Sequence, residues 1–90
     1  MAHIIRTNGS TEEINPQNGT DFGLEEMQKA VGGYIEVITI SNGRIMILDE
    51  EGKLKYKDIN PEATNLAEDF LLDGDFIVGD VIVCAKEMVQ

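Results

Sequence analysis

The sequence predicts an α+β fold, with residues 1–90 forming a single domain that has a mostly antiparallel sheet and two helices. Three observations predict it. Residues 24–31 carry apolar side chains at helical spacing and run directly into a strand of β-branched residues. Asn-Gly pairs follow two of the strand patterns, and such pairs favour hairpins. A second helical pattern begins at Asn60.

The N-terminal residues 3–6 predict a strand, and Asn8-Gly9 is the pair favoured by a two-residue type I′ turn. Residues 11–14 are expected to return antiparallel to the first strand. The proline, asparagine and glycine within residues 15–19 then predict a loop that leads to the first helix.

The first helix is predicted over residues 24–31, with one apolar stripe formed by Leu24, Met27 and Val31. Thr20 and Asp21 stand where an N-cap is expected. Gly32 is expected to end the helix with a positive φ, and Gly33 gives a second free joint before the next strand. The glycine pair also allows a second interpretation, a close approach of the backbone to a ligand or phosphate.

Residues 34–40 and 44–49 predict a central hairpin closed by the Asn-Gly pair at 42–43, with Ile38 opposite Ile47. Both faces of this hairpin are apolar. We therefore expect the first helix to cover one face, and a second helix, a loop or a partner subunit to cover the other.

Residues 53–57 alternate lysine with apolar side chains, which predicts a short edge strand whose lysines oppose edge-to-edge pairing. The second helix is predicted to begin with Asn60 as its cap and Pro61 in its first turn. Its apolar positions are Ala63, Leu66, Ala67 and Phe70. We expect this shorter helix to lie near an edge of the sheet.

The last strand has two parts, residues 76–78 and 81–84, and Gly79-Asp80 between them suggests a bulge or bend. Cys84 is the one cysteine, so an internal disulfide is excluded. Because it lies in an apolar run, it is expected to be buried and inert.

The chain carries 17 acidic and 7 basic residues, a net charge of -10. Direct binding to a nucleic-acid backbone is disfavoured, because phosphate attraction dominates that affinity. Solubility explains the charge most simply, and mimicry of a polyanion in a DNA-binding cleft is the alternative. No signal peptide is recognised, and no apolar run approaches the roughly 20 residues that cross a membrane. We therefore expect a cytoplasmic protein.

Motifs that carry chemistry are few. His3 is the single histidine, so zinc sites and Cys–His or Ser–His–Asp arrangements lack their residues. The sequence contains no Walker motif, and its glycine pair follows a helix and not a strand, unlike a dinucleotide fingerprint. We expect a non-enzymatic protein without cofactor or metal. Glu36, on the strand face shared with Tyr34 and Ile38, is expected to lie opposite Asp49 or to accept hydrogen bonds from a partner or ligand.

The run from Leu24 to Glu36, LEEMQKAVGGYIE, resembles the signature of a family of small uncharacterised proteins, the domain of unknown function numbered three-eight-four-six. Residues 50–54, Asn60 with Ala63-Thr64, and residues 77–80 are similar to later landmarks of that family, in order. The resemblance spans about residues 3 to 85. It implies an accessory protein of bacteria, phages and mobile elements with no known activity, and the chain departs from the family pattern after Thr64.

These observations favour a non-enzymatic binding or interaction protein of a phage or mobile element, whose partner is a protein or a small ligand. One alternative is a protein that sequesters a nucleotide signal of host defence, with Tyr34 stacking beside the glycine pair. Another is an acidic DNA-mimic inhibitor. A homodimer is also expected, because one sheet face would stay partly uncovered. The candidate binding residues are Gly32, Gly33, Tyr34, Glu36, Asn60 and Asp80.

Overall fold

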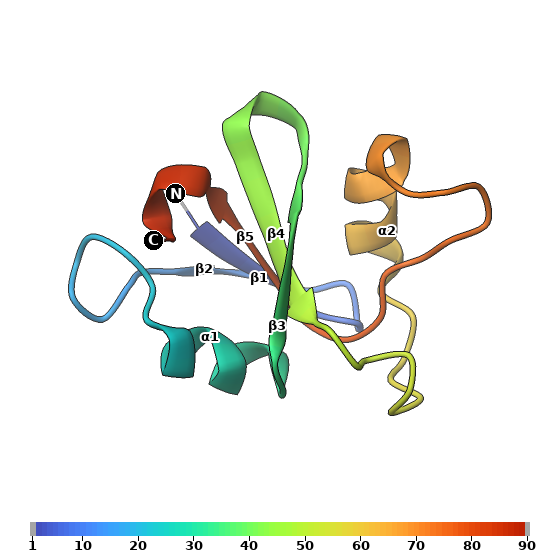
Figure 1. Cartoon of the computed structure of the whole chain (residues 1–90), viewed down its shortest axis with the longest axis horizontal. Coiled ribbons are helices and arrows are strands. Elements are labelled where there is room, and N and C mark those ends of the chain that lie inside the picture. The colour runs from blue at the N-terminus through green and yellow to red at the C-terminus, as the bar shows by residue number, and fades with distance from the viewer. Residues whose placement is uncertain (1, 90) are drawn as a thin grey trace.

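A five-stranded antiparallel sheet forms the centre of the computed structural model, which describes residues 2–89 (Figure 1). Its strand order is β2-β1-β5-β4-β3, so the last strand in the sequence lies in the middle. The α+β class is therefore confirmed. The strands are β1 (Ala2–Ile5), β2 (Thr11–Ile14), β3 (Ile35–Thr39), β4 (Arg44–Asp49) and β5 (Val81–Ala85), and the helices are α1 (Leu24–Val31) and α2 (Pro61–Ala67).

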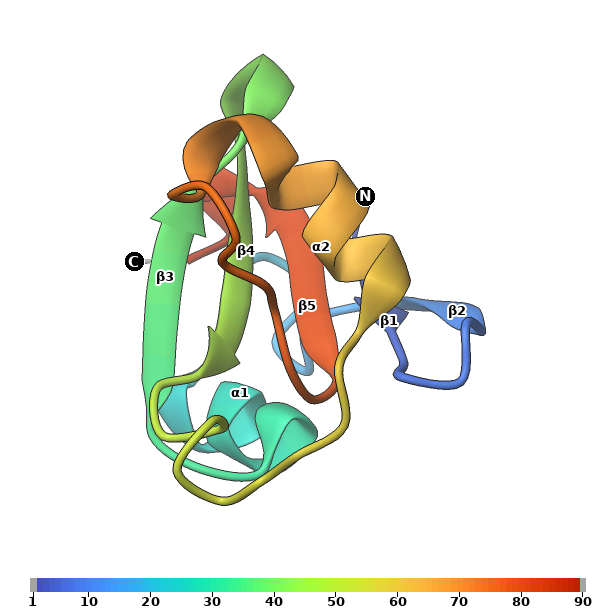
Figure 2. The same cartoon turned by 90° about the vertical axis from the view of Figure 1, so that its right-hand side faces the viewer.

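The sheet separates two buried clusters, because successive side chains of a strand point to opposite faces. On one face, side chains of β4 and β5 pack against α1: Ile45, Ile47, Ile82 and Cys84 with Met27 and Val31. On the other face, the alternate residues pack against α2: Met46, Leu48, Val81 and Val83 with Ala63 and Ala67. Figures 1 and 2 show the two helices on opposite sides of the sheet.

The second helix, expected near an edge, thus covers the face opposite α1. It begins as predicted, since the side chain of Asn60 accepts the N–H of Ala63 and Pro61 occupies the first turn. The expected homodimer rested on an uncovered sheet face. That face is covered within the chain, so this reason for a dimer is removed, and self-association itself stays a prediction.

The register of the β3–β4 hairpin differs from the predicted one. Ile38 pairs with Met46 and not with Ile47. The Asn-Gly pair does turn the chain, but Ser41 is an additional residue in the connection. The N–H of Arg44 donates to the carbonyl of Ser41, while the carbonyl of Arg44 accepts the N–H of the residue before Ser41. A one-residue slip moves a side chain to the opposite face, so Ile38 and Ile47 lie on different sides of the sheet.

The start of α1 also differs from the prediction, because Gly23 is its N-cap and not Thr20 or Asp21. The carboxylate of Glu26 accepts the N–H of Gly23 at 2.9 Å, which satisfies one free donor of the first turn. The N–H groups of Thr20 and Asp21 donate instead to the side-chain oxygen of Asn18.

Three other segments are less regular than expected. Residues 53–56 form consecutive turns, so the segment over 53–57 is not an edge strand. The β1–β2 connection spans residues 6–10 and is longer than the predicted two-residue turn, and within it Gly9 alone is left-handed, with a φ of 90°. Residues 76–78 contribute one isolated bridge, between Ile59 and Val78, so only the second part of the predicted last strand is regular. Among residues 2–89, we find no helix with the length and apolar character to cross a membrane.

Candidate functional site

An open hollow of about 480 Å³ lies beside the C-terminal end of α1. The loop that follows β4, the β1–β2 loop and the bend at Gly79-Asp80 form its other walls. Its polar lining consists of Thr7, Lys29, Tyr56, Lys57, Asp58 and Asp80. We call it the lysine hollow.

A buried carboxylate fixes the lysines on this side of the molecule. The side chain of Asp49, at the end of β4, is only 1% exposed. One of its oxygens lies 2.9 Å from the ammonium nitrogen of Lys55 and 2.7 Å from that of Lys57. Burial alone would raise the pKa of Asp49, but the hydrogen bonds from Lys57 and Lys55 and from the N–H of Glu51 lower it to about 2. Asp49 is therefore ionised and holds the ammonium groups of Lys55 and Lys57.

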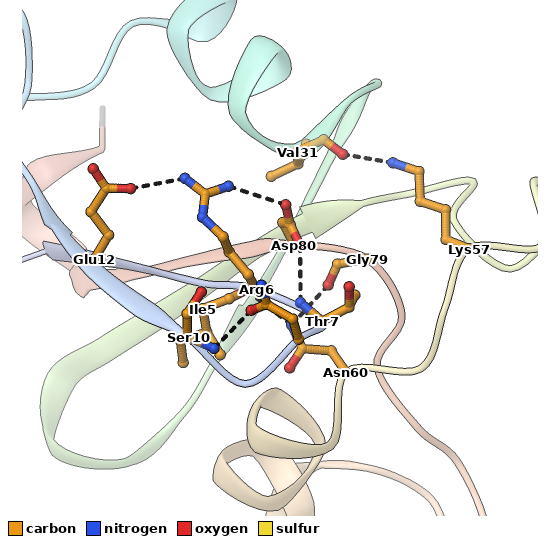
Figure 3. Close-up of polar contacts among 11 residues, drawn as sticks. Ile5, Arg6, Thr7, Ser10, Glu12, Val31, Lys57, Asn60, Gly79 and Asp80 are labelled. Atoms are coloured by element: carbon orange, nitrogen blue, oxygen red, sulfur yellow. Dashed lines mark hydrogen bonds and ion pairs between the residues drawn. The ribbon is translucent and has the colours of Figure 1, made fainter.

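The same two lysines close the end of α1. Lys57 donates to the carbonyl of Val31 at 2.7 Å, and Lys55 donates to the carbonyl of Gly32 at 3.2 Å (Figure 3 shows the Lys57 contact). The last carbonyls of a helix lack partners within it and carry the negative end of its dipole, so ammonium groups are favourable there. The contacts hold both lysine side chains in place.

Glycines make room for this arrangement. Gly32 has a φ of 86°, as predicted for a C-cap, and its N–H donates to the carbonyl of Gln28. Gly33 has a different role, since a Cβ there would lie 2.8 Å from a carboxylate oxygen of Asp49 and would also meet the Lys55 ammonium. Gly79, with a φ of 77°, would place a Cβ 3.0 Å from the Lys57 side chain. The glycine pair after α1 therefore combines a helix cap at Gly32 with space at Gly33 for Asp49 and its lysine partner.

Tyr56 stands at the hollow in an unusual conformation. Its φ is 56°, in the left-handed region that bulky residues rarely adopt, and its side chain is 93% exposed. A left-handed conformation costs a residue with a Cβ roughly 1–2 kcal/mol. The ring buries almost nothing in return, so the packing of this ring within the chain does not explain its position.

Asp80 joins the hollow to the first hairpin. Its carboxylate accepts the N–H of Thr7 at 3.0 Å and lies 3.3 Å from the Arg6 guanidinium (Figure 3). Arg6 also pairs with Glu12 at 2.9 Å. The pKa of Arg6 is raised, chiefly by the hydrogen bond to Glu12, so the guanidinium stays charged. Asp80 thus fixes the loop that carries Thr7.

Asn60 has a structural role. It is fully buried, and its amide nitrogen donates to the carbonyls of Ile5 and Gly79, each at 2.9 Å. Its side-chain oxygen caps α2, as described above. All three side-chain hydrogen bonds lie within the chain, so Asn60 connects β1, α2 and the Gly79 bend.

The structure brings only some of the predicted binding residues together. Gly32 and Asp80 line the lysine hollow, and Gly33 lies beside the ion pair of Asp49 and Lys55. Tyr34 is 68% exposed and does not line the hollow. Glu36 is exposed on β3, where it pairs with Leu48 and not with Asp49 as expected.

Sequence reasoning missed Asp49, Tyr56 and Lys57, and it did not single out Lys29 or Asp58 of the lining. One signal was present, because Asp49 is an acidic residue that ends the apolar run over 45–48 and precedes a segment with three lysines. Cys84 is buried as expected, and burial raises its pKa, which keeps it a thiol. Within residues 2–89, no three potential metal-ligating side chains form a group.

The comparisons with known proteins identify a family and no activity. The model of the family described as a domain of unknown function (DUF3846) matches residues 2–88, nearly the whole chain. No curated protein and no solved structure matches the chain.

Proposed function

Because the chain belongs to the family described as a domain of unknown function (DUF3846), which supplies no activity, we propose a function from the lysine hollow. The protein binds a small anionic ligand with a flat ring, of the nucleotide class, and does not transform it. The observation that carries this proposal is the meeting of Lys29, Lys57 and the exposed ring of Tyr56 around one hollow.

Each part of such a ligand has a matching group in the lining. Lys29 forms no ion pair with the part of the chain that the structure describes, so its ammonium is available to a phosphate. Lys57 is already oriented by Asp49 and adds a second positive charge. Tyr56 offers a face for stacking, which contributes roughly 1–3 kcal/mol per base in proteins that bind single strands. Asp58 can accept hydrogen bonds from the amino or hydroxyl groups of a nucleoside.

Two observations support binding without catalysis. A carboxylate with a pKa of about 2, such as Asp49, does not take up a proton near neutral pH. Neither histidine nor cysteine lines the hollow. Withholding a nucleotide from solution is also a suitable role for the phage or mobile-element accessory protein that the family resemblance implies.

Calorimetric titration with adenosine monophosphate, adenosine and inorganic phosphate tests this proposal. We expect the monophosphate to bind best, because it alone engages both the lysines and the ring. Lys29→Gln should weaken binding about tenfold, since a charge-assisted hydrogen bond contributes about 1.5–3 kcal/mol. Lys86→Gln, an equal change in a turn after β5, is the matched control. Equal affinity for all three compounds, or equal effects of both variants, would contradict the proposal.

A further inference from the structure

The strand β3 is an edge of the sheet, and within residues 2–89 it pairs only with β4. The flanking hydrogen bonds show which way its backbone points. The N–H of Ile40 donates to the carbonyl of Arg44, and the carbonyl of Tyr34 accepts the N–H of Glu50. Antiparallel strands alternate between bonded and non-bonded pairs, so the backbone N–H and C=O groups of the even-numbered residues of β3 point toward β4. The N–H and C=O groups of Ile35, Val37 and Thr39 therefore point away from the sheet.

This edge lacks the usual protection against pairing. Edge strands of natural proteins commonly carry lysine, proline or a bulge, and the five residues of β3 contain neither lysine nor proline. Four of the five are β-branched, and Val37 is 44% exposed. The opposite edge, β2, carries two acidic residues in four, Glu12 and Glu13, where β3 carries one in five, Glu36. The β3 edge is thus an available template for another strand.

A groove of about 210 Å³ lies beside β3 on the α2 side of the sheet. Its apolar lining includes Ile38, Leu48, Leu54, Leu71, Phe76 and Val78. Its acidic lining includes Glu36 and Glu50, which form no ion pair with the described residues. Lys53, at the same groove, is already paired with Asp75 and lies 4.6 Å from the centre of the Phe76 ring. The unpaired charges of this groove are therefore negative.

We propose that the β3 edge binds an extended segment of a partner protein in which basic and apolar side chains alternate. The segment adds a sixth strand, bonded to the free groups of Ile35, Val37 and Thr39. Side chains of the segment that lie opposite Glu36 and Ile38 point to the groove side. Charge selects a basic partner over a second copy of this chain, since each copy carries a net charge of -10.

Titration with two synthetic peptides tests the proposal, acetyl-Lys-Val-Lys-Val-Lys-amide and its counterpart with glutamate in place of lysine. Binding is followed through the backbone amide signals in NMR spectra. We expect the lysine peptide to bind, and to slow hydrogen exchange of the Ile35, Val37 and Thr39 amides. The glutamate peptide should not bind. Protection of β2 amides instead, or equal binding of both peptides, would overturn the proposal.

Two variants test separately how charge and backbone hydrogen bonds contribute to peptide binding. Glu36→Lys should weaken binding of the lysine peptide about tenfold, while Glu13→Lys, the same change on the other edge strand, should leave it unchanged. Val37→Pro removes an outward N–H without removing a bond to β4, so it should keep the fold and abolish binding. Unchanged binding in Glu36→Lys or in folded Val37→Pro would contradict the proposal. A wild-type mass in solution of twice 9.9 kDa that falls to 9.9 kDa in Val37→Pro would also contradict it, because a second copy would then occupy the edge.

Discussion

The ammonium group of Lys57 lies 2.7 Å from a carboxylate oxygen of Asp49, whose side chain is almost completely buried. The same ammonium donates to the carbonyl of Val31 at 2.7 Å. One lysine therefore joins the end of β4 to the end of α1, and it does so at the wall of the lysine hollow. The contact gives the loop over 53–57 a defined position without regular secondary structure.

Asp49→Asn should destabilise the protein by about 2–3 kcal/mol at pH 7. Removing one partner of a buried ion pair costs about 3–5 kcal/mol, and the partly exposed lysines reduce that value. Urea denaturation measures the change. Asp73→Asn, on an exposed loop, removes the same charge and should change the free energy of unfolding by less than about 0.5 kcal/mol.

The effect of Asp49 should depend on pH. Folding lowers the pKa of Asp49 from 3.8 to about 2, so its stabilisation is present above pH 3.8 and is lost as the pH falls toward 2. The difference between the wild type and Asp49→Asn should therefore shrink over this interval, by about 2 kcal/mol. A difference that stays constant between pH 5 and pH 2 would show that the carboxylate does not act through its charge.

Gly33→Ala should destabilise the fold by about 1–3 kcal/mol, because the new methyl group would overlap the Asp49 carboxylate. Thermal or urea denaturation would measure this loss. Gly23→Ala is a suitable control, since its Cβ would have no neighbour closer than 3.9 Å, and we expect it to cost less than about 1 kcal/mol. Equal losses in the two variants would mean that the space beside Asp49 is not what Gly33 provides.

Tyr56→Gly should stabilise the fold by about 0.5–1 kcal/mol, since it relieves a left-handed conformation and removes an exposed ring. Tyr56→Ala keeps the Cβ and should leave stability nearly unchanged. Both variants should lose nucleotide binding in the calorimetric titration. Retention of binding by both would remove Tyr56 from the proposed site, whatever their stability.

Asn60→Ala should cost about 3–4 kcal/mol, because it leaves the buried carbonyls of Ile5 and Gly79 without donors and removes the cap of α2. Asn65→Ala, at an exposed position of α2, is the control and should be nearly neutral. Denaturation curves distinguish the two. A stable Asn60→Ala variant with altered ligand binding would instead make Asn60 a binding residue.

Local signals in the sequence were sufficient for several elements. The positive φ at Gly32 and the start of α2 at Asn60 each depend on a few neighbouring residues, so both were predictable. The hairpin register was not. Asn42 and Gly43 both have positive φ, as the predicted turn requires. The loop includes Ser41 as well, because the register depends on which strand side chains each face of the sheet must bury.

The candidate site was less predictable than the fold, because its geometry depends on contacts between distant residues. The alternation of lysine with apolar residues over 53–57 is typical of an edge strand. Instead, both Lys55 and Lys57 contact the buried Asp49, and residues 53–56 form consecutive turns. A left-handed tyrosine is also contrary to local preference, so Tyr56 could be found only in the folded chain.

The central place of β5 affects the order in which the protein can fold. The hairpins β1–β2 and β3–β4 are local and can form within microseconds of their synthesis. Neither hairpin pairs with the other, since β5 lies between them and pairs with both β1 and β4. A nascent chain on the ribosome therefore cannot join these hairpins into one sheet until Val81–Ala85 emerge. We expect cooperative resistance to proteolysis to appear only at that length, however early the hairpins form.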